Sequence, residues 1–279
     1  MSAISLVGRG VKMAAANPWL EHAARVGYLI RGLLYGVMGV LALSLAIGTS
    51  AKTPDQRGSL YLLAGSPIAV PVLTIVIVGL SAYSIWGFTR AIYDPLGRGE
   101  KPAGVAARLG FAWSGMSYAA LVIFAIGFLL GTTRTADTGS MQNMVRSVLT
   151  RPAGAIVIIL AGVIGVAAGL GQFVDAYRAS FKSDLKRNQM SRAERVTVDS
   201  LGRFGMFSRG VVFTLLGWFV LQAGLQHDAA RAQGIAVAFQ GIARQPFGHI
   251  SLAVVALGFV ALGLHSLANA IWVRMLPQR

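Results

Sequence analysis

Cysteine is absent from this chain of 279 residues, and acidic residues number only ten. Without cysteine the chain has no disulfide, no thiolate metal site and no cysteine nucleophile. Carboxylates are too scarce for paired acid–base chemistry, because Asp175 alone falls inside an apolar stretch. The Walker, His-Glu-x-x-His and Gly-x-Ser-x-Gly signatures are missing as well. We therefore expect a protein that is not an enzyme and that uses no cofactor and no metal.

Charge is also scarce, since only 13% of the residues are charged and the mean hydropathy is +0.63. A soluble domain carries roughly a quarter charged residues. Six charge-free runs each reach about 17 residues or more, the length that crosses a hydrocarbon core as helix. The predicted spans are 26–48, 67–89, 109–132, 153–176, 205–226 and 249–273. This pattern predicts an all-α membrane protein with six transmembrane helices.

A unit of about 80 residues occurs three times along the chain. The copies open with RVGYLIRGLLYGVMG at Arg25, RLGFAWSGMSYAALV at Arg108 and RFGMFSRGVVFTLLG at Arg203. Each copy returns through a second apolar helix that follows a proline, which we expect in the first helical turn: Pro67, Pro152 and Pro246. Units with two spans keep one orientation, so we expect three parallel two-helix repeats with pseudo-threefold symmetry. The predicted divisions are 1–24, repeat 25–95, repeat 108–178, a basic linker 179–202 and repeat 203–273.

Lysine and arginine are distributed unevenly between the two sides of the predicted spans. Eighteen of the 25 lie with the termini and the loops after the second and fourth spans, and seven lie on the other side. Positive residues favour the cytoplasmic side. We therefore predict that both termini are cytoplasmic. The net charge of +15 is explained by loops that meet anionic lipid headgroups, so lipid rather than nucleic acid is the expected partner.

Three polar segments outside the spans have amphipathic patterns. Segments 140–154 and 234–248 interleave apolar with polar residues and precede the return helices, which predicts short helices in the membrane interface. The linker 179–202 and the preceding Arg178 together carry six basic residues. We expect it to form an amphipathic interfacial helix, and it is our candidate surface for a protein partner.

Polar residues inside apolar spans are the first place to seek a functional site. Arg31 lies one turn into the first predicted span, with Tyr28 and Tyr35 on the same helix face. The third repeat has Arg209 at this position, whereas the second has Ser114, followed by Tyr118. Two interpretations stay open. The arginines extend to the headgroups along their apolar stems, or they form a clamp for an anion or a lipid phosphate.

The inner ends of the return helices carry a second set of polar residues. Counted from each proline, Trp86, Gly171 and His265 share one position, and Arg90, Asp175 and Asn269 share another. Together with Gln172 and His265, the last three form a predicted intramembrane polar cluster. Asp175 is expected to pair with an arginine. His265 is either a neutral side chain hydrogen-bonded to a neighbouring helix or part of a proton relay.

The threefold Arg-x-Gly-[Tyr/Phe] opening and the Gln-Pro-Phe-Gly corner at 245–248 resemble the bacterial domain of unknown function family 1206. The resemblance covers roughly 25–272 and implies three two-helix repeats in the bacterial inner membrane. Ser114, and Ser-Pro-Ile at 66–68, depart from the family pattern. The resemblance implies no activity.

These observations predict an integral membrane module that binds lipid or a partner without catalysing a reaction. The alternative is a transporter or channel for a small solute or ion along the pseudo-threefold axis. Conduction across the bilayer needs polar groups at more than one depth. The intramembrane charges of this sequence gather at one end of the spans, which favours the binding module.

Overall fold

The computed structural model describes residues 18–49, 55, 57, 59–60, 69–94, 99, 102–132 and 140–273. Six helices in these ranges are long and apolar enough to cross a membrane, and they confirm the six predicted spans. They are α2 (Pro18–Ala46), α4 (Ala69–Tyr93), α5 (Pro102–Leu129), α7 (Gly154–Arg178), α8 (Arg192–Leu225) and α10 (Gly248–Trp272). The segment before residue 18 and the predicted role of Pro67 lie outside the described residues.

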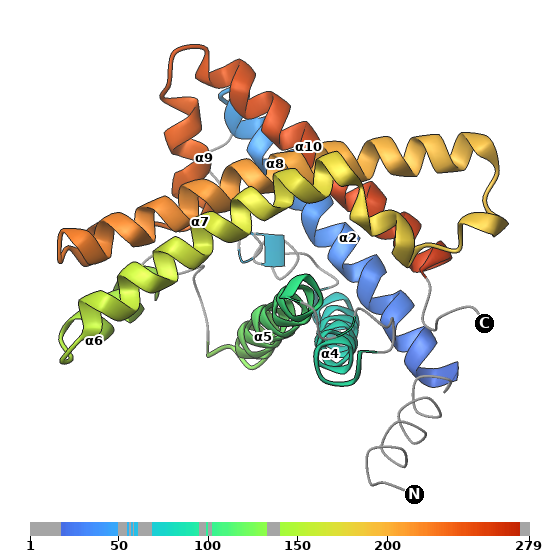
Figure 1. Cartoon of the computed structure of the whole chain (residues 1–279), viewed down its shortest axis with the longest axis horizontal. Helices are drawn as coiled ribbons and strands as arrows, with labels where there is room; N and C mark the ends of the chain where they lie inside the picture. The colour runs from blue at the N-terminus through green and yellow to red at the C-terminus, as the bar shows by residue number, and fades with distance from the viewer. Residues whose placement is uncertain are drawn as a thin grey trace, which may run out of the picture.

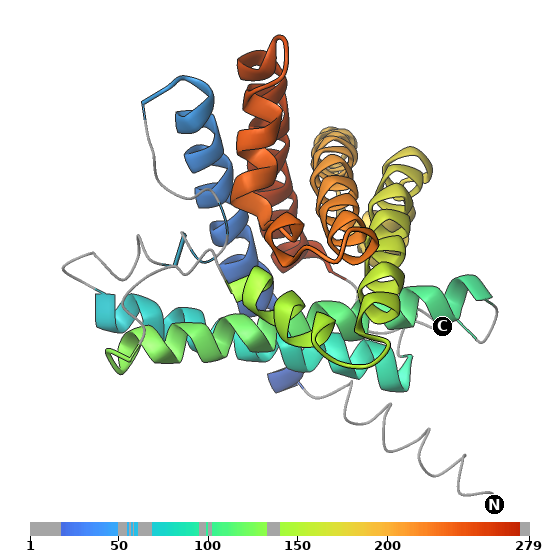
Figure 2. The same ribbon diagram turned by 90° about the vertical axis from the view of Figure 1, so that its left-hand side faces the viewer.

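The long helices pack as three antiparallel pairs, and each pair joins two different repeats. The second helix of one repeat packs along the first helix of the next, giving the pairs α4 with α5 and α7 with α8. The last helix, α10, closes the series by packing along α2 (Figure 1). In Figure 2, α4 and α5 lie across the direction of the other two pairs. The repeat therefore specifies equivalent positions, while the close packing runs between repeats.

One glycine of the repeated motif makes the same contact in all three pairs. A Cβ added at this glycine would meet the same two positions of the partner helix: Gly263 and Leu267 from Gly32, Ser84 and Phe88 from Gly115, and Gly169 and Phe173 from Gly210. Small residues let helix backbones approach closely where lipid gives no hydrophobic drive to association. The three cross-repeat contacts are thus built by equivalent residues.

Packing inside the repeats is uneven. In the first repeat α2 packs on α4, and in the third α8 packs on α10. In both, the glycine of the Arg-x-Gly opening lies against the return helix: a Cβ added at Gly27 would lie 2.6 Å from the Cβ of Tyr83, and one at Gly205 would lie 2.8 Å from the Cα of Leu262. A Cβ added at the equivalent Gly110 of α5 would have no neighbouring atom within 4 Å. The middle hairpin is therefore open.

The predicted amphipathic segments form short helices, α6 (Ser140–Leu149) and α9 (Ile235–Ala243), before α7 and α10. The prediction that Pro152 and Pro246 lie in the first helical turn is wrong. Helices α7 and α10 begin two residues later, each after a residue in the left-handed conformation, with φ of 59° at both. The chain turns so tightly here that a Cβ on Gly248 would contact the Ala243 carbonyl. Proline therefore belongs to the corner rather than to the helix.

The linker 179–202 does not form a separate amphipathic helix. It begins with two 3₁₀ turns, η1 (Ser180–Asp184) and η2 (Arg187–Gln189), and its second half is the start of α8. Ser191 caps α8 through a capping box with Glu194, which satisfies two backbone N–H groups at the helix start. The linker is tied to the end of α10, because the Lys186 N–H donates to the Trp272 carbonyl.

Candidate functional site

Arg31 of α2 lies among aromatic rings contributed by three helices. Its Nη1 donates a hydrogen bond to the hydroxyl of Tyr83 on α4. The guanidinium carbon lies 5.3 Å from the Tyr35 ring centre and 5.2 Å from that of Tyr83. Both distances fall within the range of cation–π attraction. The arginine is therefore held by ring faces and one hydroxyl, and in the described part of the chain no carboxylate pairs with it.

Four tyrosines form one continuous buried group around this arginine. Tyr83 packs edge to face against Tyr28, with ring centres 5.1 Å apart, and against Tyr118 of α5, with ring centres 4.8 Å apart. The Tyr118 hydroxyl donates to the Tyr35 hydroxyl over 3.2 Å. Each of the four side chains is 4% exposed or less. The structure thus brings together Tyr28, Tyr35 and Tyr118 as the sequence suggested.

Tyr83 is the member of this group that sequence analysis missed. The residues at its position in the other repeats are Ala168 and Leu262, so comparison of the repeats gives no signal there. The only available signal was spacing, because Tyr83 lies seven residues, or two turns, before Arg90 on the same helix.

Arg209 of α8, like Arg31 of α2, stacks on the aromatic ring four residues further along its own helix. Its guanidinium carbon lies 4.6 Å from the ring centre of Phe213, one turn further on, as Arg31 does with Tyr35. Ser114, at the equivalent position of α5, is half-buried and makes no hydrogen bond that reaches this group.

Arg90 of α4 is a third arginine stacked on aromatic rings. It is 6% exposed, and its guanidinium carbon lies 4.1 Å from the Phe111 ring centre and 5.7 Å from that of Trp86. The Nε groups of Arg31, Arg90 and Arg209 are all buried without an acceptor, as is the indole nitrogen of Trp86. We call these three arginines the arginine cluster. Their aromatic neighbours are Tyr28, Tyr35, Tyr83, Trp86, Phe111, Tyr118 and Phe213.

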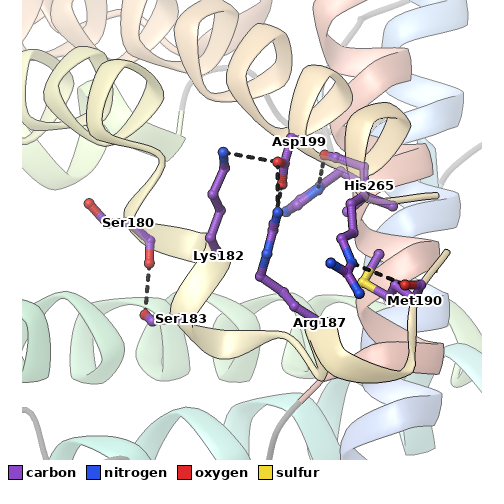
Figure 3. Close-up of polar contacts among 9 residues, drawn as sticks. Ser180, Lys182, Ser183, Arg187, Met190, Asp199 and His265 are labelled. Atoms are coloured by element: carbon purple, nitrogen blue, oxygen red, sulfur yellow. Dashed lines mark hydrogen bonds and ion pairs between the residues drawn. The ribbon is translucent and has the colours of Figure 1, made fainter. Parts of the chain in front are cut away.

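The predicted intramembrane polar cluster is not assembled. Arg90 lies with Phe111 and Trp86, whereas His265 is buried on α10 at 3% exposure. The His265 Nδ1, which Figure 3 shows, lies 3.2 Å from the Val198 carbonyl oxygen, and the His265 ring packs edge to face on Phe181. This geometry matches the neutral, hydrogen-bonded interpretation, in which Nδ1 carries the proton and donates it.

Asp175, Gln172 and Asn269 are half-buried, and among the described residues none of them makes a side-chain hydrogen bond or an ion pair. The expected pairing of Asp175 with Arg178, Arg31 or Arg209 is therefore not formed in this structure. The described ranges hold no group of three or more His, Cys, Asp or Glu side chains that could bind a metal ion.

The loop between α7 and α8 carries the best-defined ion pairs. Asp199, in the first turns of α8 and before its apolar span, lies 2.9 Å from the Lys182 Nζ and 2.6 Å from the Arg187 Nη1 (Figure 3). Burial raises the pKa of Asp199, but hydrogen bonds from Arg187 and Lys182 outweigh it and hold the pKa below its ordinary value. These ion pairs fix the loop against the N-terminal part of α8, and the Lys186 N–H bond to the Trp272 carbonyl joins it to the end of α10.

The fold and the site define a multi-pass helical membrane protein with three copies of a two-helix unit and three arginines stacked on aromatic rings. Comparison with known proteins gives the same division. The model of the family described as Domain of Unknown Function (DUF1206) matches residues 26–94, 109–179 and 204–273. The chain belongs to this family, as the resemblance indicated.

A curated relative covers almost the whole chain. It is named Uncharacterized protein YxxB, from Bacillus subtilis (strain 168), and is 28% identical over 260 residues, 93% of each chain. No solved structure matches this chain.

Proposed function

We propose that this protein is a non-enzymatic membrane module that binds the anionic headgroup of a lipid at the arginine cluster. The proposal rests on one observation. Each of the three arginines stacks on an aromatic ring and has a buried Nε group without a hydrogen-bond acceptor. A buried N–H donor without an acceptor costs about 1–3 kcal/mol, and more where the group is charged. An anion between these guanidinium groups would remove that penalty and accept the free N–H groups.

A phosphate is the anion that suits such a site. Guanidinium groups present planar forks of N–H donors that match phosphate oxygens. The tyrosine hydroxyls supply further donors at the same place, since Tyr35 and Tyr118 lie within hydrogen-bond distance of each other. Aromatic rings keep water away from the guanidinium groups, which strengthens their attraction for an anion. In a membrane helix bundle the abundant source of phosphate is the lipid headgroup.

We place the protein in the bacterial inner membrane with both termini and the arginine cluster on the cytoplasmic side. The excess of lysine and arginine in the loops of that side supports this orientation. We further propose that the three repeats are related by an approximate threefold rotation. The equivalent contacts of Gly32, Gly115 and Gly210 support that relation.

Conduction along the axis has weaker support. Relative to the predicted spans, Arg31 and Arg209 lie within the first turns of 26–48 and 205–226, and Arg90 follows the last residue of 67–89, so all three lie at the same end of the spans. A path across the bilayer requires polar groups at several depths. A binding site at one depth matches this distribution better.

The test is the double variant Arg31→Gln with Arg209→Gln, purified from bacterial membranes in mild detergent. The lipid that co-purifies is measured by native mass spectrometry. We expect at least a tenfold loss of bound anionic lipid, because two charged donors leave the site. The matched control is Arg151→Gln with Arg244→Gln, which removes the same charge from exposed positions at the other end of the helices. Unchanged anionic lipid in the Arg31/Arg209 variant would refute the proposal.

A further inference from the structure

The middle hairpin exposes positions that are buried in the other two repeats. On α5, Trp113 is 67% exposed, whereas Ile30 and Ser208 at the equivalent positions are 8% and 1% exposed. On α7, Ile164 is 68% exposed, and its equivalents Gly79 and Gly258 are buried. Helices α5 and α7 thus lack the close packing that joins α2 to α4 and α8 to α10, and we call the space between them the opening.

Residue size explains why this hairpin cannot close as the others do. In the first repeat Tyr83 and Trp86 fill the space between the two helices, and both are 2% exposed or less. In the third repeat Leu262 and His265 fill it, at 1% and 3% exposure. The second repeat has Ala168 and Gly171 at these positions.

Both small residues, Ala168 and Gly171, are exposed. A Cβ added at Gly171, or at Gly110 on α5, would have no neighbouring atom within 4 Å. If α5 and α7 closed directly, a cavity of two missing side chains would remain. Cavities destabilise a fold by about 24 cal/mol for each Å³.

We propose that the acyl chain of a phospholipid occupies the opening between α5 and α7, with its phosphate at Arg90. This inference rests on the proposed binding of an anionic headgroup and names the ligand and its position. The walls are apolar, being formed by Gly110, Trp113, Ile164, Ala168 and Gly171.

The charged end of the opening is adjacent to these walls, because Phe111 follows Gly110 and stacks on the buried Arg90 guanidinium. Asp175 lies one turn beyond Gly171 and is the one carboxylate on the described α7 helix. The three arginines outnumber it, so the local charge favours an anion.

Continuity with the arginine cluster argues for a lipid rather than for a second copy of this chain. Helix α5 contributes Phe111 and Tyr118 to the aromatic neighbours of that cluster and Gly110 and Trp113 to the opening. One amphipathic molecule with an anionic end and an apolar tail satisfies both features at once. A helix from a second copy would fill the apolar part and leave the Arg90 Nε without an acceptor.

The experiment uses the full chain in nanodiscs of phosphatidylglycerol and phosphatidylcholine at a ratio of about one to three. The probe is phosphatidylglycerol with a photoreactive diazirine on one acyl chain, and labelled peptides are mapped by mass spectrometry. We expect labelling of α5 around Gly110 and Trp113 and of α7 from Ile164 to Gly171. This labelling should exceed that on the other lipid-facing helices by about tenfold. The same probe built on phosphatidylcholine should lack this excess.

Gly171→Trp tests the opening directly, because it restores the side chain that the first repeat carries at Trp86. We expect it to reduce the labelling at least tenfold. The matched control is Gly241→Trp on α9, which adds the same indole at another glycine with nothing within 4 Å. If Gly171→Trp does not fold, Ala168→Leu restores the third repeat's Leu262 and replaces it. Retained helical circular dichroism and an unchanged gel-filtration volume identify folded variants.

The outcomes separate the two proposals. Loss of bound lipid in the Arg31/Arg209 variant, with labelling that is even over all helices or unaffected by Gly171→Trp, overturns the position of the tail and leaves headgroup binding in place. Unchanged lipid in that variant overturns headgroup binding and this inference together.

Discussion

The glycine of the repeated Arg-x-Gly motif allows the same substitution in three repeats, with one result expected in the first and third repeats and another in the second. We predict that Gly27→Ala and Gly205→Ala destabilise the protein and that Gly110→Ala does not. An added Cβ would lie 2.9 Å from the Tyr83 Cα in the first repeat and 2.8 Å from the Leu262 Cα in the third. These are backbone atoms, so the helices must move apart. At Gly110 nothing lies within 4 Å.

The magnitude follows from two opposing effects. Overpacking of a close contact costs about 1–3 kcal/mol, and alanine gains about 1 kcal/mol over glycine in a helix interior. That gain is reduced here, since a membrane helix unfolded in detergent keeps much of its helical structure. We therefore expect Gly27→Ala and Gly205→Ala to lose about 1–2 kcal/mol of unfolding free energy. For Gly110→Ala we expect an unfolding free energy that is unchanged or higher by up to about 1 kcal/mol.

The assay is reversible unfolding in mixed micelles of a mild detergent and sodium dodecyl sulfate, followed by circular dichroism and tryptophan fluorescence. A difference of 1.4 kcal/mol between variants is a tenfold change in the unfolding equilibrium constant, which this measurement resolves. Equal destabilisation by all three substitutions would refute the reasoning, because it would mean that α5 packs on α7 as tightly as α8 packs on α10.

Two further predictions concern the corner and the loop. Gly248→Ala should lower the unfolding free energy by about 1–3 kcal/mol, because its Cβ would contact the Ala243 carbonyl. The control is Gly241→Ala, whose Cβ would have no neighbouring atom within 4 Å. It should not lower the unfolding free energy in the same assay. Asp199→Asn should cost about 1 kcal/mol at pH 7 by removing the ion pairs with two cations. Because the folded pKa of Asp199 is depressed, this contribution is complete above its unfolded value of 3.8 and is lost as the pH falls through the folded pKa. The difference between wild type and variant should therefore stay constant from pH 7 to about pH 4 and shrink below; a difference that already shrinks between pH 7 and pH 5 would contradict it.

The six spans and the repeat could be predicted because each depends on local sequence. A run without charges specifies a membrane helix by length alone, and all six agree with the helices of the structure. The pairing of helices could not be predicted, because the same glycine motif is compatible with packing inside a repeat or between repeats. Within one such pair, Gly165 and Gly169 of α7 lie against α8 at Gly217 and Thr214.

Residues that differ among the repeats were the hardest to interpret. Tyr83 belongs to the group around Arg31, yet its equivalents are alanine and leucine, so alignment of the repeats conceals it. Asp175 stands where the first repeat has Arg90, and equivalence suggested that it shares a polar cluster. The structure separates the two because α7 does not close on α5, whereas α4 packs along α5 and brings Arg90 against Phe111.

Three residues of the second repeat, Ser114, Ala168 and Gly171, are smaller than their equivalents in the other repeats, and all three belong to the hairpin formed by α5 and α7. Ser114 removes the positive charge found in the other repeats, and Ala168 and Gly171 remove two large side chains. Three identical hairpins would each fill their own interior and would leave no space for a ligand. Reduction of side-chain volume in one hairpin leaves an apolar opening beside charges that the other two repeats still supply through Arg31 and Arg209. A site for one phospholipid would then arise because the symmetry of the repeat is broken once, and restoring the large side chain at 171 should close it.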